Sequence, residues 1–344
     1  MRIKNYAAFL FVLTLGFTSC KKDDDPTGPT VVERDRAEQQ IVDNDSLLGY
    51  FETHYYNAST FATPGNYKMS DLIISELPKD AQGNYMPLPD PDNNKLLSDP
   101  GVLEIKTTTY LEVEYTYYIL RLTVGGGNNP KFTDNVKINY SGNLMNEDVF
   151  DSTANPTVLD LVNVIPGWRN VIPDFKSSVG IPTIGPDGKE QYDNYGFGVM
   201  FLPSGLAYYS SPPFGIPVYS NLIFRFQVFQ SGHNDHDGDG IWSHMEDLNT
   251  NENVYDDDTD GDNVPNFLDA NDDNDTLTTR NELKFNTYTV DTNQGEQEPV
   301  LAQNEFEISR TVSSGVITIR TAVLLDSNND GTPDYLDKTI TIQG

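Results

Sequence analysis

Alternating apolar and polar residues dominate the middle of the chain, from residue 113 to residue 231, and predict an antiparallel β domain. Every second residue from Val113 to Ile119 is apolar, and a run that is one residue out of step begins at Leu120, where we expect a β-bulge. Later runs of β-branched and aromatic residues are separated by Gly, Pro and Asn turns. Among them, residues 167–178 predict one short helix.

A helical pattern precedes this domain, over residues 34–56. Its apolar positions recur at helical spacing, and either Asp43 or Asp45 is placed to cap the helix N-terminus. These apolar positions are Ile41, Leu47, Leu48, Phe51 and Tyr55. Residues 58–101 are rich in Pro, Asn and Asp and predict irregular structure. We therefore assign residues 34–112 to a helical and irregular region that packs on the chain's own β domain.

Strand-like alternation returns over residues 305–325. Ser313, Ser314 and Gly315 interrupt it and are the expected turn of a hairpin. The pattern predicts a small β-rich element within residues 283–344.

Composition narrows the possible partners. With 344 residues the chain can hold two or three domains. Its formal net charge of −30 argues against a nucleic-acid partner, whose phosphates require Lys and Arg. It has a single cysteine, so no intramolecular disulfide forms.

The N-terminus predicts a lipoprotein. Arg2 and Lys4 precede a short apolar run, and small residues stand directly before Cys20, which resembles a bacterial lipobox. Residues 1–19 would be the signal peptide, lipidated Cys20 the membrane anchor, and residues 20–33 the tether. The acidic residues 23–25 resemble an export signal of Bacteroidetes surface lipoproteins, so we expect an outer-membrane protein, periplasmic or surface-exposed. The alternative is an ordinary signal peptide with an incidental cysteine.

Four acidic loops share one spacing of oxygen-bearing side chains. In the first, Asp235, Asp237 and Asp239 occupy positions 1, 3 and 5, and Glu246 occupies position 12. Alternate residues of such a tight turn point inward and supply the roughly six to eight oxygens that Ca²⁺ takes. The other three loops are Asp258, Asp260, Asp262 and Asp269; Asn271, Asp273, Asp275 and Glu282; and Asp326, Asn328, Asp330 and Asp337.

The spacing decides between bound calcium and a solvated acidic linker. Residues 233–282 hold sixteen acidic residues and one basic residue, Arg280, a density that repels itself without cations. Because the register recurs, we predict structural Ca²⁺, and the loops resemble thrombospondin type 3 repeats. We assign residues 232–282 to these repeats and the fourth loop to the β-rich element. His233, His236 and His244 lack partnering cysteines and are predicted at the loop surface, not as zinc ligands.

Five sequence blocks of the middle region occur in one order. They are residues 136–142, 149–152, 164–168, 201–208 and 216–226. In this order the chain resembles the FKBP-type peptidyl-prolyl isomerases over residues 114–230. The resemblance implies an α+β fold, with a twisted antiparallel half-barrel around a short helix and the substrate pocket between them. We assign residues 113–231 to this domain.

The resemblance also implies the site. Trp168 would form the pocket floor, Asp151 would be a buried acid beside it, and the Tyr208 hydroxyl would donate to the substrate carbonyl. Ile165 would offer its backbone N–H. The apolar walls would be Tyr140, Phe150, Val164, Ile165, Ile216 and Phe224. No cofactor is implied for catalysis.

Three departures from the family pattern bear on rate and specificity. Thr157 stands where an aromatic wall residue is usual, Tyr209 replaces a glycine, and residues 180–196 are an insertion. The sequence predicts a membrane-anchored prolyl isomerase whose clients are proline-containing exported or outer-membrane proteins. The alternative is a non-catalytic, calcium-stiffened surface lipoprotein for binding or adhesion.

Overall fold

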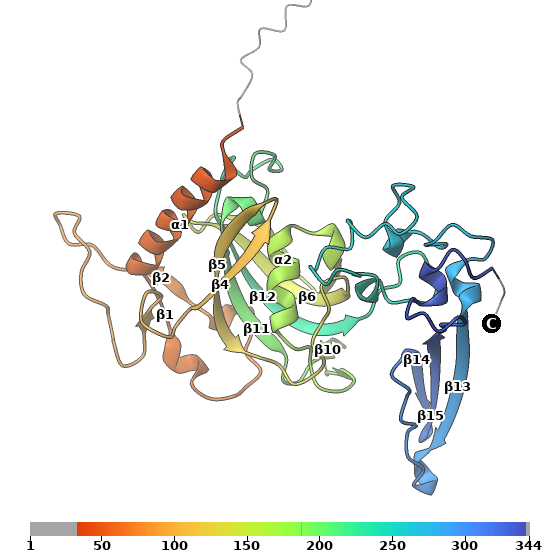
Figure 1. Ribbon diagram of the computed structural model, residues 1–344. Coiled ribbons are helices and arrows are strands. Elements are labelled where there is room, and N and C mark those ends of the chain that lie inside the picture. The colour runs from red at the N-terminus through yellow and green to blue at the C-terminus, as the bar shows by residue number, and fades with distance from the viewer. Residues whose placement is uncertain (1–32, 187, 342–344) are drawn as a thin grey trace, which may run out of the picture. The chain divides into compact units, whose positions relative to one another are not determined.

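The structure is a computed structural model that describes residues 33–186 and 188–341 (Figure 1). The predicted signal peptide and Cys20 lie outside the described residues. The chain divides into the units Met1–Arg34 and Asp35–Gly344, and all the helices and strands of the described residues lie in the second. Within the described ranges, no helix has both the length and the apolar character that a bilayer crossing requires.

A seven-stranded antiparallel sheet forms the middle of the chain, in the order β4-β5-β11-β12-β6-β7, with β8 also paired to β6. Its strands are β4 (Glu104–Tyr110), β5 (Val113–Thr123), β6 (Asn135–Leu144), β7 (Val149–Ser152), β8 (Thr157–Asp160), β11 (Gly196–Leu202) and β12 (Leu222–Gly232). The register between β5 and β11 shifts beside Gly198 and skips Leu122. The predicted bulge in β5 is therefore present, two residues further along the strand.

One face of the sheet packs on the short helix α2 (Pro166–Val171), which continues into the 3-10 turn Ile172–Asp174. Proline is favoured at the first helical position, because a backbone N–H there would have no hydrogen-bond partner within the helix. A Cβ on Gly167 would lie 2.3 Å from a methyl carbon of Leu202, so only glycine lets α2 approach β11 this closely. Tyr115, Tyr117 and Ile119 lie in this core, as their alternation predicts.

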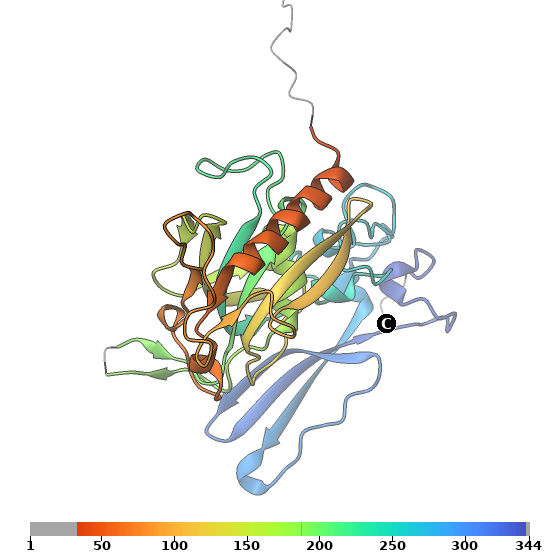
Figure 2. The ribbon, with the colours of Figure 1, turned by 90° about the vertical axis from the view of Figure 1, so that its left-hand side faces the viewer.

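The opposite face packs on α1 (Arg36–Thr53), which lies across the sheet in Figure 2. Leu47 and Phe51 are buried as predicted, whereas Ile41 and Leu48 are exposed. The predicted caps were wrong: Asp35 caps the helix by accepting a hydrogen bond from the Glu38 N–H. Asp43 is instead buried within the helix.

The remaining strands form three small sheets. In the N-terminal region β1 (His54–Tyr56) pairs with β2 (Ile74–Glu76) and β3 (Lys95–Leu96). The 180–196 insertion contains the hairpin of β9 (Thr183–Ile184) and β10 (Glu190–Gln191). The C-terminal sheet has the order β13-β15-β14, with β13 (Leu283–Asp291), β14 (Glu305–Ser313) and β15 (Val316–Leu324).

The predicted C-terminal hairpin is confirmed by the β14–β15 pairing. Its turn residues Ser314 and Gly315 have φ angles of 51° and 82°, a conformation that favours glycine at the second position. Strand β13, which pairs with β15 along its whole length, was not predicted.

Candidate active site and acidic loops

A cavity of about 350 Å³ opens beside α2 and holds most of the predicted pocket residues. It is lined by Tyr140, Asp151, Leu159, Asn163, Val164, Ile165, Trp168, Tyr208 and Phe224. Seven of these nine were predicted. The other two predicted residues, Phe150 and Ile216, lie in the core cluster that surrounds Trp168. Leu159 and Asn163 were not predicted; they come from β8 and the turn after it.

Aromatic rings form the floor of the cavity. Trp168 is 3% exposed, and its ring centroid lies 5.5 Å from that of Tyr140 and 5.1 Å from that of Phe224, both edge-on. The register of β6 with β12 places Gly142 opposite Phe224, where a Cβ would lie 2.5 Å from the Phe150 ring. Glycine at this position therefore makes room for both phenylalanine rings.

Two phenols, those of Tyr140 and Tyr208, supply hydroxyl groups to the cavity. The Tyr140 hydroxyl donates to Asp151 Oδ2 at 2.6 Å. The Tyr208 hydroxyl donates to no other residue in the described ranges. Burial, and secondarily the Asp151 carboxylate, raises the pKa of Tyr208, so this phenol stays protonated and is a free donor.

Asp151 corrects one expectation. The resemblance implied a buried acid, but the side chain is exposed. β7 is the edge strand of the sheet, and no neighbouring strand covers it. The carboxylate still orients a wall residue, because it accepts the Tyr140 hydrogen bond. Burial, followed by this hydrogen bond, raises the pKa of Tyr140.

Helix α1 holds the loop that carries Tyr208. Asp43 is 2% exposed, and its Oδ2 accepts from the Ser204 backbone N–H at 2.8 Å and from the Ser204 hydroxyl at 2.6 Å. Tyr209, which replaces the glycine usual in the family, has a φ of 51°. Its ring lies under the Arg36 guanidinium at 3.9 Å, a cation–π contact. The N-terminal region thus positions the cavity wall from behind.

We expect Asp43→Ala to lower both stability and isomerase activity. The substitution leaves the buried Ser204 donors without an acceptor, at a cost of roughly 3 kcal/mol, and releases the loop before Tyr208. Thermal unfolding and kcat/KM on a proline peptide measure the two effects. Asp45→Ala, on the exposed side of the same helix, is the matched control. Equal kcat/KM in the two variants would contradict a positioning role for α1.

All four acidic loops share one hydrogen bond that joins residues seven positions apart. The backbone N–H at position 2 donates to the side chain at position 9, which is the first residue of a 3-10 turn. The pairs are His236 to Ser243 Oγ at 3.2 Å, Thr259 to Asn266 Oδ1 at 2.9 Å, Asp272 to Thr279 Oγ at 3.2 Å and Ser327 to Asp334 Oδ1 at 2.7 Å. The loops therefore adopt one repeated conformation.

Buried carboxylates converge in the first loop. Asp239, Glu246 and Asp272 are 2%, 1% and 1% exposed, and their ligand atoms lie within 4.8 Å of one another. Neither Glu246 carboxylate oxygen has a hydrogen-bond partner in the described part of the chain. Burial, followed by the charge of Asp237, raises the pKa of Asp239 to about 8. Buried carboxylates need a counter-charge, and a divalent cation fits this donor set.

The other loops differ in burial. In the third, Asp273, Asp275 and Glu282 also lie within 4.8 Å of one another, and both oxygens of the buried Glu282 lack a partner among the described residues. The second loop brings together the less buried Asp258, Asp260 and Asp262. In the fourth, the Asn328 side-chain amide donates to the carboxylates of Asp330 and Asp337.

The sequence prediction missed two features of the loops. Asp272 extends from the third loop into the donor set of the first. A further turn starts at Asp247, whose two carboxylate oxygens accept from the Asn251 and Glu252 N–H groups at 3.1 and 2.9 Å. In the first loop the two carboxylate oxygens of Asp235 accept from backbone N–H groups in a similar way. Asn at positions 3 and 5 of this turn, in place of Asp, was the overlooked signal.

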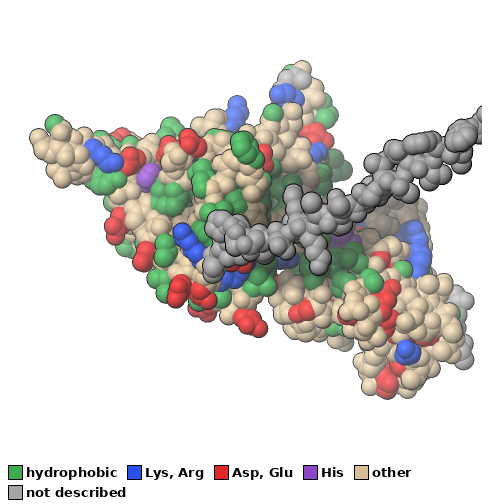
Figure 3. Space-filling model, turned by 90° about the horizontal axis from the view of Figure 1, so that it is seen from above, with side chains coloured by type: hydrophobic (Ala, Val, Ile, Leu, Met, Phe, Trp, Pro, Cys, Tyr) green, Lys and Arg blue, Asp and Glu red, His purple; other side chains and the backbone are tan. Residues whose placement is uncertain are grey.

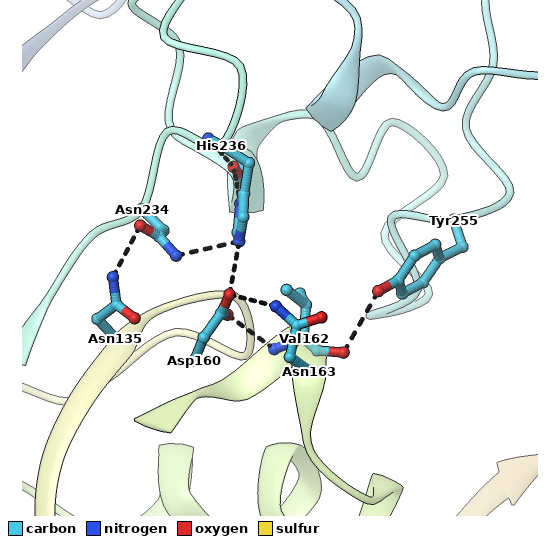
Figure 4. Close-up of polar contacts among 8 residues, drawn as sticks. Asn135, Asp160, Val162, Asn163, Asn234, His236 and Tyr255 are labelled. Atoms are coloured by element: carbon cyan, nitrogen blue, oxygen red, sulfur yellow. Dashed lines mark hydrogen bonds and ion pairs between the residues drawn. The ribbon is translucent and has the colours of Figure 1, made fainter. Parts of the chain in front are cut away.

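The loops dock beside the cavity through polar contacts (Figure 4). His236 Nε2 lies 3.1 Å from Asp160 Oδ2, and the Tyr255 hydroxyl donates to the Val162 carbonyl at 3.3 Å. Val162 also packs in a small apolar cluster with Val254 and Phe267. His236 is thus a docking residue, not the surface residue predicted.

In Figure 3 acidic and basic side chains are interspersed on the visible face and form no single acidic patch there.

Comparison with known proteins finds two curated relatives and one family model. The chain is 32% identical over 119 residues to the FKBP-type peptidyl-prolyl cis-trans isomerase FkpA of Aeromonas hydrophila, which covers 34% of this chain and 38% of that protein. It is 38% identical over 58 residues to the peptidyl-prolyl cis-trans isomerase Mip of Coxiella burnetii, 16% of this chain and 25% of that one. A family model described as BamM C-terminal matches residues 236–319.

Solved structures with similarity include two isomerases. A Pseudomonas syringae peptidyl-prolyl cis-trans isomerase has 20% identity, a TM-score of 0.30, and covers 39% of this chain and 84% of that one. FkpA from Escherichia coli has 25% identity, a TM-score of 0.29, and covers 37% and 51%. About a third of this chain is similar in sequence to the curated FkpA isomerase, and the chain spans well under half the length of either curated relative.

Proposed function

We propose that the protein is a peptidyl-prolyl cis-trans isomerase that acts on proline-containing polypeptides. The observation that carries the proposal is the cavity floored by Trp168, with a free hydroxyl on Tyr208, inside the region homologous to these enzymes. The reaction requires a cavity lined by aromatic rings and a hydrogen-bond donor for the substrate carbonyl, and both are found together here.

The reaction needs no acid, base or covalent intermediate. Rotation about a prolyl amide crosses a barrier of ~20 kcal/mol, because C–N resonance is lost at the twisted geometry. A site accelerates it by binding the twisted amide better than either planar form. Water stabilises the charge-separated planar amide, so an apolar cavity lined by Trp168 and Phe224 lowers the barrier. The Tyr208 hydroxyl would hold the substrate carbonyl while the bond turns.

We expect Tyr208→Phe to reduce kcat/KM by roughly fivefold while the fold is kept. The substitution removes one hydrogen bond to substrate, worth about 1 kcal/mol, and changes no packing atom. A protease-coupled proline-peptide assay measures the loss. Tyr118→Phe is the matched control, because that hydroxyl donates to Asn44 on the other face of the sheet. Equal activity of Tyr208→Phe and the wild type would show that the carbonyl is held elsewhere.

The acidic loops favour a structural role for Ca²⁺ beside this activity. Asp235, Asp237, Asp239, Glu246 and Asp272 would hold the first ion, and Asn271, Asp273, Asp275 and Glu282 another. Each supplies oxygen atoms, the ligand type that calcium takes, and the unpartnered oxygens of Glu246 and Glu282 support this assignment. Bound ions would neutralise the repulsion among carboxylates and stiffen the connection to the C-terminal sheet.

The same proposal places the protein at the outer membrane. Lipidation of Cys20 would anchor it, and its clients would be exported or outer-membrane proteins that contain proline. Membrane partitioning of the full chain, compared with Cys20→Ala, tests the anchor. The Cys20→Ala chain remaining with the membrane fraction would contradict it.

A further inference from the structure

We propose a transition-metal site, suited to Zn²⁺, formed by Asp134, His233 and His244 where the acidic loops leave the central sheet. These three residues offer ligand atoms that lie within 4.8 Å of one another. The site is separate from the acidic loops in its ligand chemistry, because two of its three donors are imidazole nitrogens.

Strand pairing brings two of the ligands together. In the antiparallel register of β12 with β6, Gly232 lies opposite Asn135, so the next pair outward is His233 and Asp134. His233 Nδ1 lies 3.0 Å from Asp134 Oδ1. The Asp134 side chain is 1% exposed and also accepts the Lys131 backbone N–H at 2.8 Å, which fixes its orientation.

The first acidic loop delivers the third ligand. Its chain turns back so that the Ser243 N–H donates to the Asn234 carbonyl at 2.8 Å, which returns the 3-10 turn Ser243–Met245 to the end of β12. The His244 ring then lies 4.9 Å from the His233 ring, centroid to centroid. His244 Nδ1 is buried and has no hydrogen-bond partner in the part of the chain that the structure describes.

This donor set selects the kind of metal. Ca²⁺ takes oxygen ligands almost exclusively, whereas Zn²⁺ binds imidazole nitrogen and carboxylate oxygen at about 2.0–2.2 Å. Ligand atoms of a tetrahedral zinc ion are about 3.4 Å apart. His233 Nδ1 lies 3.0 and 3.2 Å from the two Asp134 carboxylate oxygens, slightly closer than that spacing, and the His233 side chain is 40% exposed and free to adjust toward His244. Three protein ligands would leave the fourth position to water.

Such an ion would fasten the first acidic loop to the sheet. Asp134 stands at the start of β6, His233 follows β12, and His244 lies two residues before the buried Glu246. Zinc would therefore tie together three segments that the chain brings from separate parts of its sequence. It would act beside the contacts of His236 and Asp160 drawn in Figure 4.

The test is metal uptake by the purified full chain in detergent with saturating Ca²⁺. We expect one Zn²⁺ per chain by elemental analysis, and a Co²⁺ visible spectrum typical of nitrogen and oxygen ligands. His233→Asn, His244→Ala and Asp134→Asn are each expected to weaken Zn²⁺ binding by at least a hundredfold or so. His236→Gln, in the same loop but outside the cluster, is expected to bind as the wild type does.

His233→Asn keeps the test decisive if the other variants unfold, because its side chain is half exposed. Zinc uptake by His233→Asn equal to that of the wild type would overturn the site. Zinc uptake by the wild type that disappears as Ca²⁺ is raised would also overturn it, since that ion would sit in the acidic loops.

Discussion

Replacing Trp168 with leucine is expected to lower kcat/KM by roughly 10- to 100-fold. The indole forms the cavity floor, and the contact area that leucine cannot restore against a proline ring is worth about 1.5–3 kcal/mol. Leucine keeps an apolar side chain in the core, so less stability is lost than with alanine, which would cost roughly 3–5 kcal/mol at this buried position. Protease-coupled kinetics and binding of a proline peptide measure the effect.

The chain provides its own control for this substitution. It has two tryptophans, and Trp242 lies in the first acidic loop, where its Nε1–H donates to the Glu307 carbonyl at 2.9 Å. Trp242→Leu is expected to leave kcat/KM unchanged. If Trp168→Leu retains full turnover while folding normally, the cavity is not the catalytic site, and the binding-protein alternative gains support.

The aromatic residues of the cavity were predictable because each belongs to a local sequence block. Trp168 follows Pro166 at a helix start, and Tyr140 and Phe224 lie on strands whose alternation fixes the inward face. Leu159 and Asn163 were not predictable in this way. They reach the cavity because β8 pairs with the far end of β6, a non-local contact that no local pattern reveals.

The burial of charged residues was the weakest part of the sequence prediction. Asp43 was expected at a helix end and is instead buried against Ser204, because the tertiary partner outweighs the local capping preference. Asp151 was expected to be buried and its side chain is exposed, because β7 is an edge strand. In both cases the partner lies on a different element, and a single sequence contains no record of it.

The histidines illustrate the same limit. All three near the first acidic loop lie within residues 233–244, yet His236 contacts Asp160 while His233 contacts Asp134. The antiparallel register of β6 with β12 brings His233 beside Asp134, whereas the loop after β12 carries His236 to Asp160. Spacing rules describe residues within one loop, so the recurring acidic pattern could be predicted from the sequence. The cluster of Asp134, His233 and His244 could not, because it is assembled from two strand ends and a turn.

Removal of calcium is expected to unfold the acidic loops while the central sheet stays folded. At a free calcium concentration of about a thousand times the Kd, binding of one ion stabilises the folded state by about 4 kcal/mol. Chelation should therefore lower the melting temperature of residues 232–344 by on the order of 15 °C. In the Trp168→Leu background, Trp242 is the sole tryptophan and its fluorescence reports this transition alone. Catalytic activity of the wild-type protein, in which Trp168 is intact, reports the central sheet.

The pH dependence of the chelated protein has a definite sign. Burial raises the pKa of Asp239 to about 8 and, with the charge of Asp239, that of Asp272 to about 9, above their unfolded values. A carboxyl group whose folded pKa is raised favours folding when protonated, and that contribution is lost as pH rises through the folded pKa. The chelated loops should therefore melt higher at about pH 5 than at about pH 8, whereas calcium should reverse this order, because it binds the ionised carboxylates. An identical melting temperature with calcium and with chelator at about pH 8 would show that the carboxylates are neutralised by protons and not by a cation.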